Sequence, residues 1–331
     1  MNSSLETADA QQVTEIFLEQ VQSVRQQLKQ TIVGQDAVLD QLLICALTGS
    51  HALLVGAPGL AKTLMVKTLA NAFHWRFSRI QFTPDLMPSD ITGYELLARE
   101  ASSGITEMQF RHGPVFANLV LADEINRAAP KTQSALLEAM AERHVTVGGQ
   151  TYPLEEPFLV LATQNPIEQE GTYPLPEAQL DRFMMEIHIG YPTREQEKEI
   201  VYKTTAEPVE IPESRLPGDA FLKLRRTVRA VPVPEAVVDL AVDLTIRSRP
   251  DSETAPETVS NYVAFGAGPR GSQNLVLAAK ARALLEGRTS PIPADIEAVA
   301  LPILRHRIIM NHRAIGDNFS VDSLVDSILN R

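Results

Sequence analysis

The chain has 331 residues, of which 44% are hydrophobic and 21% are charged, a composition typical of a globular protein large enough for two domains. Its formal net charge is −11, and nearly all of the acidic excess lies in the first 190 residues, which disfavours sequence-independent binding of nucleic acid. The single cysteine, Cys45, excludes an intramolecular disulfide. Because we see no signal peptide and no apolar run of about 18 residues, we expect a cytoplasmic protein with no membrane span.

Helical and strand-like patterns alternate along the first half of the chain. Apolar residues at helical spacing predict a helix over residues 11–30, and a second helix follows the turn at Gly34. The apolar run at 51–55 predicts a strand that leads into a glycine-rich loop and another helix. Four more strand-like runs cover residues 77–82, 118–123, 157–163 and 183–189. This alternation predicts an α/β fold with a parallel sheet that helices flank on both faces.

Two segments depart from this alternation, and the second half of the chain differs from the first. Residues 85–112 are longer than a helix-to-strand connection needs, and residues 143–154 alternate around two glycines, which predicts a β-hairpin. Helical patterns then fit residues 193–205, 217–229, 234–248, 271–287, 293–301 and 319–330. We therefore expect an α/β core over residues 1–190 and an all-helical domain over residues 191–331.

The stretch GAPGLAKT, residues 56–63, departs from the phosphate-loop pattern G-x-x-x-x-G-K-[ST] only at Ala61. In such a loop the backbone N–H groups point at the phosphates from the head of a helix. Lys62 would place its charge on the β- and γ-phosphates, and the Thr63 hydroxyl would ligate Mg²⁺. A methyl group at Ala61 costs little if the backbone φ angle there is negative. The expected phosphate-binding residues are Gly56, Ala57, Pro58, Gly59, Leu60, Ala61, Lys62, Thr63 and Leu64.

Polar side chains end two of the later strands. Asp123 and Glu124 follow a buried strand, and parallel sheets bind ligands at the carboxyl ends of their strands. Asp123 would hold Mg²⁺ through its water shell, and Glu124 would orient and polarise the attacking water. Asn165, after the next such strand, could hold this water on one side and the γ-phosphate on the other.

Together these motifs resemble those of the AAA+ ATPases, in which a phosphate loop, an acidic pair and an asparagine occur in this order. The details are similar to the MoxR family: GAPGLAKT, LADEINRA, ATQNP, EAQLDRF and GPRGSQNL. The resemblance covers about residues 11–331 and implies an AAA+ P-loop core followed by a helical lid. Alanine is the usual residue of this family at the position of Ala61, which implies a working loop.

The resemblance also implies roles for residues outside the loop. Asn165 resembles the sensor 1 residue, and Arg270 resembles the sensor 2 arginine that the lid brings to the γ-phosphate. Arg182 resembles an arginine finger offered to the nucleotide of a neighbouring subunit, since a guanidinium can neutralise charge on the transferring phosphoryl group. Arg127 is the rival finger, ranked second because it follows the acidic pair of its own subunit. The expected catalytic residues are Glu124, Lys62, Asn165, Arg182 and Arg270.

Three further segments take their interpretation from the same resemblance. The turn with Ile32, Val33 and Gly34 resembles the adenine side of the nucleotide site. Residues 85–112 and 143–154 resemble the helix-2 insert and the pre-sensor-1 hairpin of the branch that includes MoxR, magnesium chelatase and replicative helicases.

The implied function is hydrolysis of ATP to ADP and phosphate, with Mg²⁺, in a homo-oligomeric ring expected to be a hexamer. MoxR relatives are thought to act as chaperones on protein clients, often with a von Willebrand factor A domain partner, which would be a separate protein here. A nucleic-acid motor remains an alternative, although the 143–154 hairpin is followed by Glu155 and Glu156 and the core is acidic. A chelatase-type subunit is a second alternative. A small-molecule kinase would have no use for the lid and the two sensor positions.

Overall fold

The computed structural model describes residues 18–99, 106–167, 171–206 and 220–330. Its centre is a sheet of five strands, all parallel, in the order β2-β5-β8-β1-β9. The strands are β1 (Ala52–Val55), β2 (Phe77–Gln81), β5 (Leu119–Asp123), β8 (Leu159–Gln164) and β9 (Met185–His188). The predicted parallel sheet is confirmed, and β1 lies between β8 and β9, so the loop that follows β1 opens near the middle of the sheet.

Helices cover both faces of this sheet, and their apolar faces form the core. The helices of the first half are α2 (Asp36–Thr48), α3 (Lys62–Ala72), α4 (Pro88–Thr92), α5 (Pro130–Glu142) and α6 (Glu177–Leu180), preceded by a helix over residues 18–31. The helix predicted over residues 11–30 is therefore observed from residue 18, and its first part lies outside the described residues. Among the described residues, no helix combines the length and the apolar character needed to cross a membrane.

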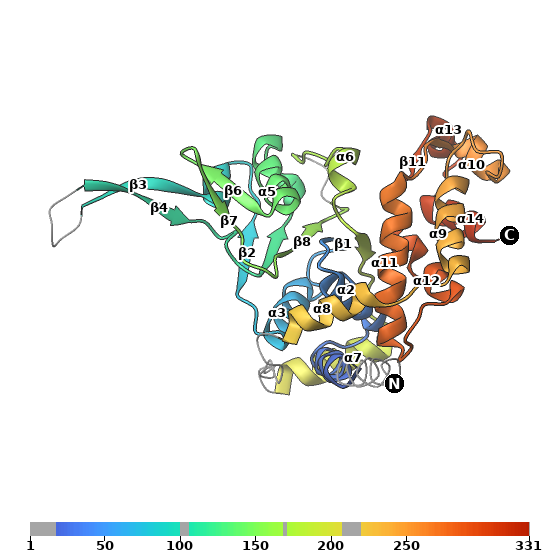
Figure 1. Ribbon diagram of the computed structural model, residues 1–331, viewed down its shortest axis with the longest axis horizontal. Coiled ribbons are helices and arrows are strands. Elements are labelled where there is room, and N and C mark those ends of the chain that lie inside the picture. The colour runs from blue at the N-terminus through green and yellow to red at the C-terminus, as the bar shows by residue number, and fades with distance from the viewer. Residues whose placement is uncertain (1–17, 100–105, 168–170, 207–219, 331) are drawn as a thin grey trace, which may run out of the picture.

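The two segments that interrupt the sequence pattern both form antiparallel hairpins. Strands β3 (Gly93–Arg99) and β4 (Thr106–His112) follow α4 within the 85–112 segment and project from the core (Figure 1). Strands β6 (His144–Val147) and β7 (Gln150–Pro153) form the predicted second hairpin. The Phe110 ring stacks on the Tyr152 ring with centroids 4.0 Å apart, so the bases of the two hairpins support each other.

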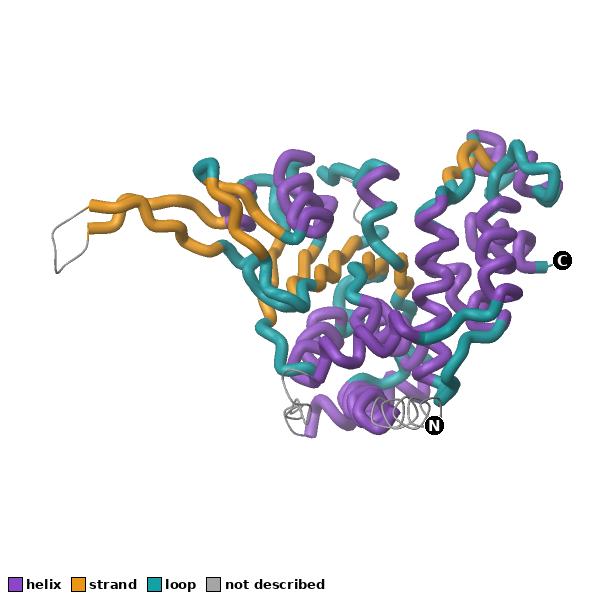
Figure 2. Tube along the Cα trace, viewed as in Figure 1, coloured by secondary structure: helices purple, strands orange, loops and turns teal. Residues whose placement is uncertain are grey.

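The second half of the chain is mostly helical, as predicted (Figure 2). Its helices are α7 (Arg194–Ala206), α8 (Ala220–Ala230), α9 (Glu235–Arg247), α10 (Glu257–Tyr262), α11 (Pro269–Leu285), α12 (Pro293–Leu304), α13 (His312–Gly316) and α14 (Val321–Leu329). One detail of the prediction is wrong, because β10 (Val263–Phe265) and β11 (Ile309–Met310) form a small antiparallel pair. These strands of three and two residues are too short to give a periodic pattern.

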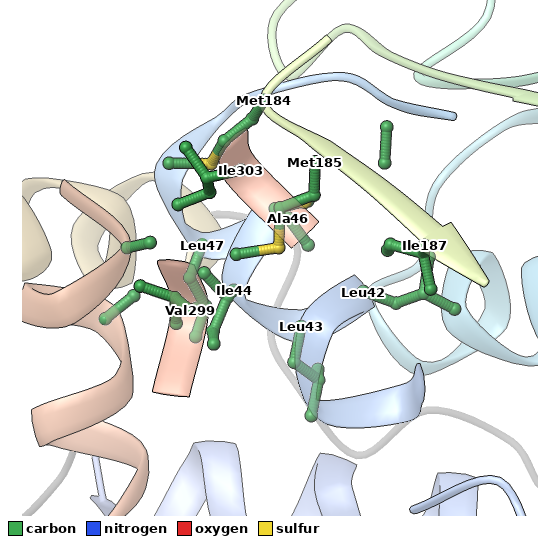
Figure 3. Close-up of a cluster of buried hydrophobic side chains, with 14 of the residues drawn as sticks. Leu42, Leu43, Ile44, Ala46, Leu47, Met184, Met185, Ile187, Val299 and Ile303 are labelled. Atoms are coloured by element: carbon green, nitrogen blue, oxygen red, sulfur yellow. The ribbon is translucent and has the colours of Figure 1, made fainter. Parts of the chain in front are cut away.

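The boundary near residue 190 does not separate two hydrophobic cores. Helix α8 packs on α2, and the Phe221 ring meets the rings of Phe73 and Trp75 with centroids 5.1 and 4.6 Å apart. Figure 3 shows the same continuity at another place, where residues of α2 and β9 lie against Val299 and Ile303 of α12. One apolar cluster therefore extends from the sheet into the C-terminal helices, which ties their orientation to the core.

Candidate functional site

The loop between β1 and α3 has the backbone shape of an anion cradle. Gly59 has φ +82°, and a Cβ atom there would find no described heavy atom within 4 Å, so its backbone faces open space. At Gly56, by contrast, a Cβ would lie 2.8 Å from the backbone oxygen of Ile189. Glycine is needed at this second position because β1 continues into the loop directly against the end of β9.

The structure corrects one expectation about this loop. Ala61 is the residue before the first residue of α3, and its φ is +57° with ψ +20°, not negative. An L-residue in this left-handed conformation is strained by about 1 kcal/mol, which a glycine would avoid. The conformation turns the chain into the helix start, so the N–H groups of the first turn of α3 face the cavity end of the loop.

Lys62 and Thr63 begin α3 and line a cavity of about 380 Å³ at the carboxyl edge of the sheet. The Lys62 Nζ donates a hydrogen bond of 2.7 Å to the backbone oxygen of Gly56, which holds the ammonium group over the loop. Burial lowers the pKa of Lys62, while the nearby Asp123 and Glu124 carboxylates oppose this shift. The cavity is lined by Pro58, Gly59, Ala61, Lys62, Thr63, Leu64, Arg79, Gln81, Asp123, Glu124 and Asn165.

The acidic pair, Asp123 and Glu124, lines the same cavity as the end of the loop. Thr163, on the neighbouring strand β8, fixes both acids: its hydroxyl donates to Asp123 Oδ1 at 2.7 Å and accepts from the Glu124 N–H at 2.8 Å. Glu124 has φ +57°, a left-handed conformation for a residue with a Cβ. The backbone turn after β5 therefore places two adjacent carboxylates in one cavity.

Two residues of β2 belong to this site and were not recognised in the sequence. The Arg79 guanidinium donates to Asp123 Oδ2 at 2.6 Å and to Gln81 Oε1 at 2.8 Å. The Gln81 amide in turn donates to Glu124 Oε2 at 2.8 Å. The only sequence signal was their spacing of two residues, which puts them on one face of a strand. That signal could be used only once β2 was known to lie next to β5.

Asn165 lies after β8, buried in the same cavity wall, where its Oδ1 accepts the N–H of Ile167 at 3.2 Å. The structure thus brings together Lys62, Thr63, Asp123, Glu124 and Asn165, which approach from three strand ends. The cavity therefore combines a carboxylate pair, an ammonium group, a hydroxyl and an amide with the backbone N–H groups of the loop. Together these groups suit a polyphosphate with a bound divalent cation.

A second cavity, mostly apolar, adjoins the first through Gly59, Ala61 and Leu64. It is lined by Thr31, Ile32, Val33, Gln35, Gly59, Leu60, Ala61, Leu64, Pro192, Ile200, Lys203 and Thr204. Gly34 lies in the same turn with φ +74°, and the Gln196 side chain is packed against it. Ala57 is buried and lines neither of the two cavities. An apolar cavity beside a phosphate loop has the chemistry that an adenine ring requires.

The three arginines named from the sequence lie in different places. Arg127 donates to Glu124 Oε2 at 3.0 Å within its own subunit. The Arg270 guanidinium donates to Asp181 Oδ2 at 3.1 Å, and the Arg182 guanidinium donates to the backbone oxygen of Leu137. Among the residues that the structure describes, the lining of the phosphate cavity includes none of the three. Arg270 therefore pairs with the residue that precedes Arg182, while the Arg182 guanidinium itself is held at the Leu137 backbone oxygen of α5.

Comparison with known proteins agrees with this geometry. The family profile described as "ATPase family associated with various cellular activities (AAA)" matches residues 51–185, and that of the AAA lid domain matches residues 256–328. The chain is 45% identical to the protein named Chaperone MoxR1 of Mycobacterium tuberculosis over 303 residues, 92% of this chain and 79% of that protein. It is 32% identical to Protein MoxR of Paracoccus denitrificans, over 86% of this chain and 87% of that protein.

Two further similarities bear on the fold and on the alternatives. The crystal structure of a candidate ATPase from Cytophaga hutchinsonii superposes with a TM-score of 0.91 at 41% identity and covers 98% of each chain. The magnesium-chelatase 38 kDa subunit of Acidiphilium rubrum is 30% identical over 197 residues, which are 56% of this chain and 51% of that protein. The similarity to the chelatase subunit is thus confined to about half of each chain.

Proposed function

We propose that this chain, which belongs to the MoxR family of AAA+ ATPases, binds ATP with Mg²⁺ and hydrolyses it to ADP and phosphate. The observation that carries this proposal is the convergence of Lys62, the Asp123–Glu124 pair and Asn165 on one cavity at the head of α3. The adjoining apolar cavity at residues 31–35 supplies a place for the adenine. Groups that bind phosphate and a carboxylate that can polarise water are the two requirements of phosphoryl transfer to water.

The roles follow from where each side chain is held. Lys62 is fixed over the loop by the Gly56 oxygen and would bind the β- and γ-phosphates. Glu124 would orient the attacking water and accept its proton, which requires that it leave the Gln81 amide or share it. Asn165 would hold this water from the opposite wall. Thr163 acts as a positioning residue, because one hydroxyl contacts both members of the acidic pair.

The donor set also fits Mg²⁺. The Thr63 hydroxyl and the Asp123 carboxylate line one cavity, and hard oxygen ligands of this kind with retained waters suit this ion. Mg²⁺ bound there would neutralise charge on the β- and γ-phosphates. Arg79, which holds Asp123 Oδ2, would have to release that oxygen or share it.

Arg182 and Arg270 are proposed to act on the nucleotide of a neighbouring subunit. Arg270 pairs with Asp181, the Arg182 guanidinium contacts the Leu137 oxygen, and neither arginine lines the phosphate cavity of its own chain, which agrees with a finger in trans and extends this idea to the sensor 2 arginine. A site completed by a second copy requires a head-to-tail arrangement, which forms a ring when the rotation between subunits closes, and we propose a closed ring here. The proposed assembly is a hexamer. Each subunit is proposed to consist of a core over residues 1–190 and a lid over residues 191–331.

The proposed biological role is that of a chaperone that remodels or matures client proteins, in keeping with the name of the Mycobacterium tuberculosis relative. A von Willebrand factor A domain protein is the proposed partner. The buried Cys45, whose thiol pKa is raised by burial, is compatible with the reducing cytoplasm that we propose as its location.

The primary test separates binding from turnover. Lys62→Ala should abolish tight ATP binding, measured by calorimetry, because the phosphates lose their cation. Glu124→Gln should bind ATP and fail to hydrolyse it, since an amide cannot accept the proton of the water. If both variants lose ATP binding to the same extent, the role assigned to Glu124 is wrong.

A second measurement addresses the alternative functions. Because the core is acidic, ATP turnover should not rise when single- or double-stranded DNA is added. A salt-sensitive stimulation would favour the nucleic-acid motor. A pull-down with ATP-bound Glu124→Gln from native extract should recover a protein partner, whereas recovery of a porphyrin-binding subunit would favour the chelatase alternative.

A further inference from the structure

The segment that follows α12 carries three consecutive buried polar residues, Arg305, His306 and Arg307. Burying an arginine is unfavourable unless its charge is paired and its N–H groups find acceptors. The side chain of Arg307 is only 2% exposed, and burial lowers its pKa to about 10 against the opposing effect of Asp181. Because the buried charge of Arg307 must stay paired, the acceptors of its N–H groups are held in fixed positions.

Arg307 contacts the Ile303 oxygen and the His306 ring in its own segment, and its other acceptors lie on both sides of Arg182. Its Nε donates to Asp181 Oδ1 at 2.9 Å, and its Nη2 and Nη1 donate to the backbone oxygens of Phe183 at 2.7 Å and Met184 at 3.1 Å. A guanidinium is planar, so these three bonds fix the residues before and after Arg182 in one rigid frame. The side chain of Arg307 thereby determines where the backbone of Arg182 lies.

Other parts of the C-terminal helices hold the same turn. Arg270, at the start of α11, takes the second oxygen of Asp181, and the His306 ring lies 3.0 Å from the Phe183 oxygen. Figure 3 shows Met184 beside Ile303 in the buried cluster at the end of α12. Two lid arginines therefore share one carboxylate immediately before Arg182, and apolar packing fixes the residues immediately after it.

We propose that Arg307 and Asp181 form a clamp through which the lid of each subunit positions Arg182, making Arg307 a positioning residue for hydrolysis at the neighbouring site. The proposal rests on the function proposed above, in which Arg182 acts in trans. A change of lid orientation on nucleotide binding would then reach the next site in the ring through this clamp. Catalytic geometry is sensitive to such shifts, since a displacement of about 1 Å can slow a reaction by about a hundredfold.

The same segment supplies a matched control. Arg305 is also an arginine with a nearly buried side chain, 7% exposed, but its Nη2 donates to Asp322 Oδ2 at 2.9 Å, a contact between α12 and α14 within the lid. Loss of the Arg305 guanidinium should weaken the packing of the lid without displacing residues 181–184. Arg305→Lys therefore measures how a weakened lid alone changes kcat. Arg307→Lys measures how loss of the clamp changes kcat.

The experiment compares Arg307→Lys, Asp181→Asn and Arg305→Lys in the full chain. Each keeps the volume of the side chain approximately, and circular dichroism with thermal melts shows whether each folds. For Arg307→Lys and Asp181→Asn we expect kcat to fall at least about tenfold, with KM and the Kd for ATP within about twofold of the unmodified chain. Arg305→Lys should also lower the melting temperature, because it loses the bond to Asp322, and should leave kcat within about twofold.

A second step shows whether Arg307 acts through Arg182. Arg182→Lys should retain measurable turnover, and adding Arg307→Lys to it should lower kcat by no more than about twofold, since the guanidinium to be positioned is already absent. A full additional tenfold fall, an equal kcat loss in Arg305→Lys, or an unchanged kcat in Arg307→Lys would overturn the clamp. If Arg182→Lys itself turns over ATP at the normal rate, hydrolysis does not need the Arg182 guanidinium, and both the proposed finger and the clamp are wrong.

Discussion

The phosphate cavity and the junction between the lid and β9 both hold charged side chains in fixed positions, but in opposite environments. In the cavity the charges are partly accessible: Arg79 is 48% exposed and Lys62 and the two acids line open space. At the junction the side chain of Arg307 is 2% exposed and donates to backbone oxygens. Loss of a cavity charge should therefore remove chemistry, whereas loss of a junction charge should displace the residue that it holds.

The largest expected effect concerns Arg182, which is held at the junction and is proposed to act at the phosphate cavity of the neighbouring subunit. Arg182→Ala should lower kcat by about three to five powers of ten, on the order of 4–7 kcal/mol, because a charge clamp on the transition state is removed. The Kd for ATP should stay within a few fold, since Arg182 does not line its own cavity. Steady-state ATPase kinetics and calorimetry measure the two quantities on the same protein.

Mixed assemblies distinguish the two candidate fingers. Arg182→Ala keeps an intact cavity and Lys62→Ala keeps an intact finger, so mixing the two inactive variants should restore part of the turnover. Gel filtration must first show that mixed rings form. If they form and remain inactive, while Arg127→Ala mixed with Lys62→Ala recovers activity, Arg127 is the finger.

The difference between the regions also explains what the sequence could predict. Much of the cavity depends on short motifs, so Lys62, Thr63 and the Asp123–Glu124 pair, which line it, could be named from the sequence, whereas Ala57 was named and lines neither cavity. Arg79 and Gln81 join them only through the pairing of β2 with β5, which no local pattern encodes. Arg307 meets Asp181 across 126 residues, and nothing in its neighbourhood in the sequence indicates this contact.

Prediction of the fold from the sequence has the same limit. The parallel strands were predicted from apolar runs of strand length and the longer helices from their periodicity, because each is long enough to show its pattern. Strands β10 and β11 are too short to do so, and the sign of φ at Ala61 depends on how the loop meets α3. Local chemistry was thus predictable, and contacts made by tertiary packing were not.

Two buried histidines have lowered pKa values: His51 at the amino end of β1, opposite the edge of the sheet that holds the phosphate cavity, and His306 at the junction. Their contributions to stability can be compared. His51, before β1, accepts the Val160 N–H and faces the Met140 oxygen, and burial together with Arg143 lowers its pKa to about 4. The unfolded chain therefore binds more protons between about pH 6.5 and pH 4. The contribution of the neutral His51 to the free energy of unfolding is fully present above about pH 6.5. It decreases as the pH falls, by up to about 3 kcal/mol.

The test measures the free energy of unfolding against pH for His51→Gln and His306→Gln. Burial and Arg307 also lower the pKa of His306, so both variants should lose less stability on acidification than the unmodified chain. His312→Gln serves as the control, because it replaces a histidine that the fold leaves exposed. A pH dependence unchanged in His51→Gln would show that this histidine is not held neutral by the fold.

A smaller effect is expected when the acids of the cavity stay but lose their shared anchor. Thr163→Val keeps the shape and removes the hydroxyl that contacts Asp123 and the Glu124 N–H. We expect kcat to fall about tenfold, about 1.4 kcal/mol, with ATP binding retained. Thr68→Val is the matched control, because Thr68 is equally buried and donates only to a backbone oxygen of its own helix. Equal losses of kcat in the two variants would mean that Thr163 is structural only.

The smallest effect concerns the residue that departs from the phosphate-loop pattern. Ala61 has φ +57°, where glycine is unstrained, so Ala61→Gly should remove about 1 kcal/mol of strain. Glycine also gives the unfolded chain more freedom, which offsets about half of this gain and leaves a net stabilisation of roughly 0.5 kcal/mol. Urea denaturation should show a slightly higher midpoint, with ATP affinity within about twofold because the direction of the loop N–H groups is unchanged. Ala57→Gly is the control, since Ala57 is buried in the same loop and is not among the residues with positive φ, so that only unfavourable effects remain, the added freedom of the unfolded chain and the loss of a buried methyl group. If Ala61→Gly lowers the midpoint as Ala57→Gly does, the left-handed conformation at residue 61 is not the one that the loop adopts in solution.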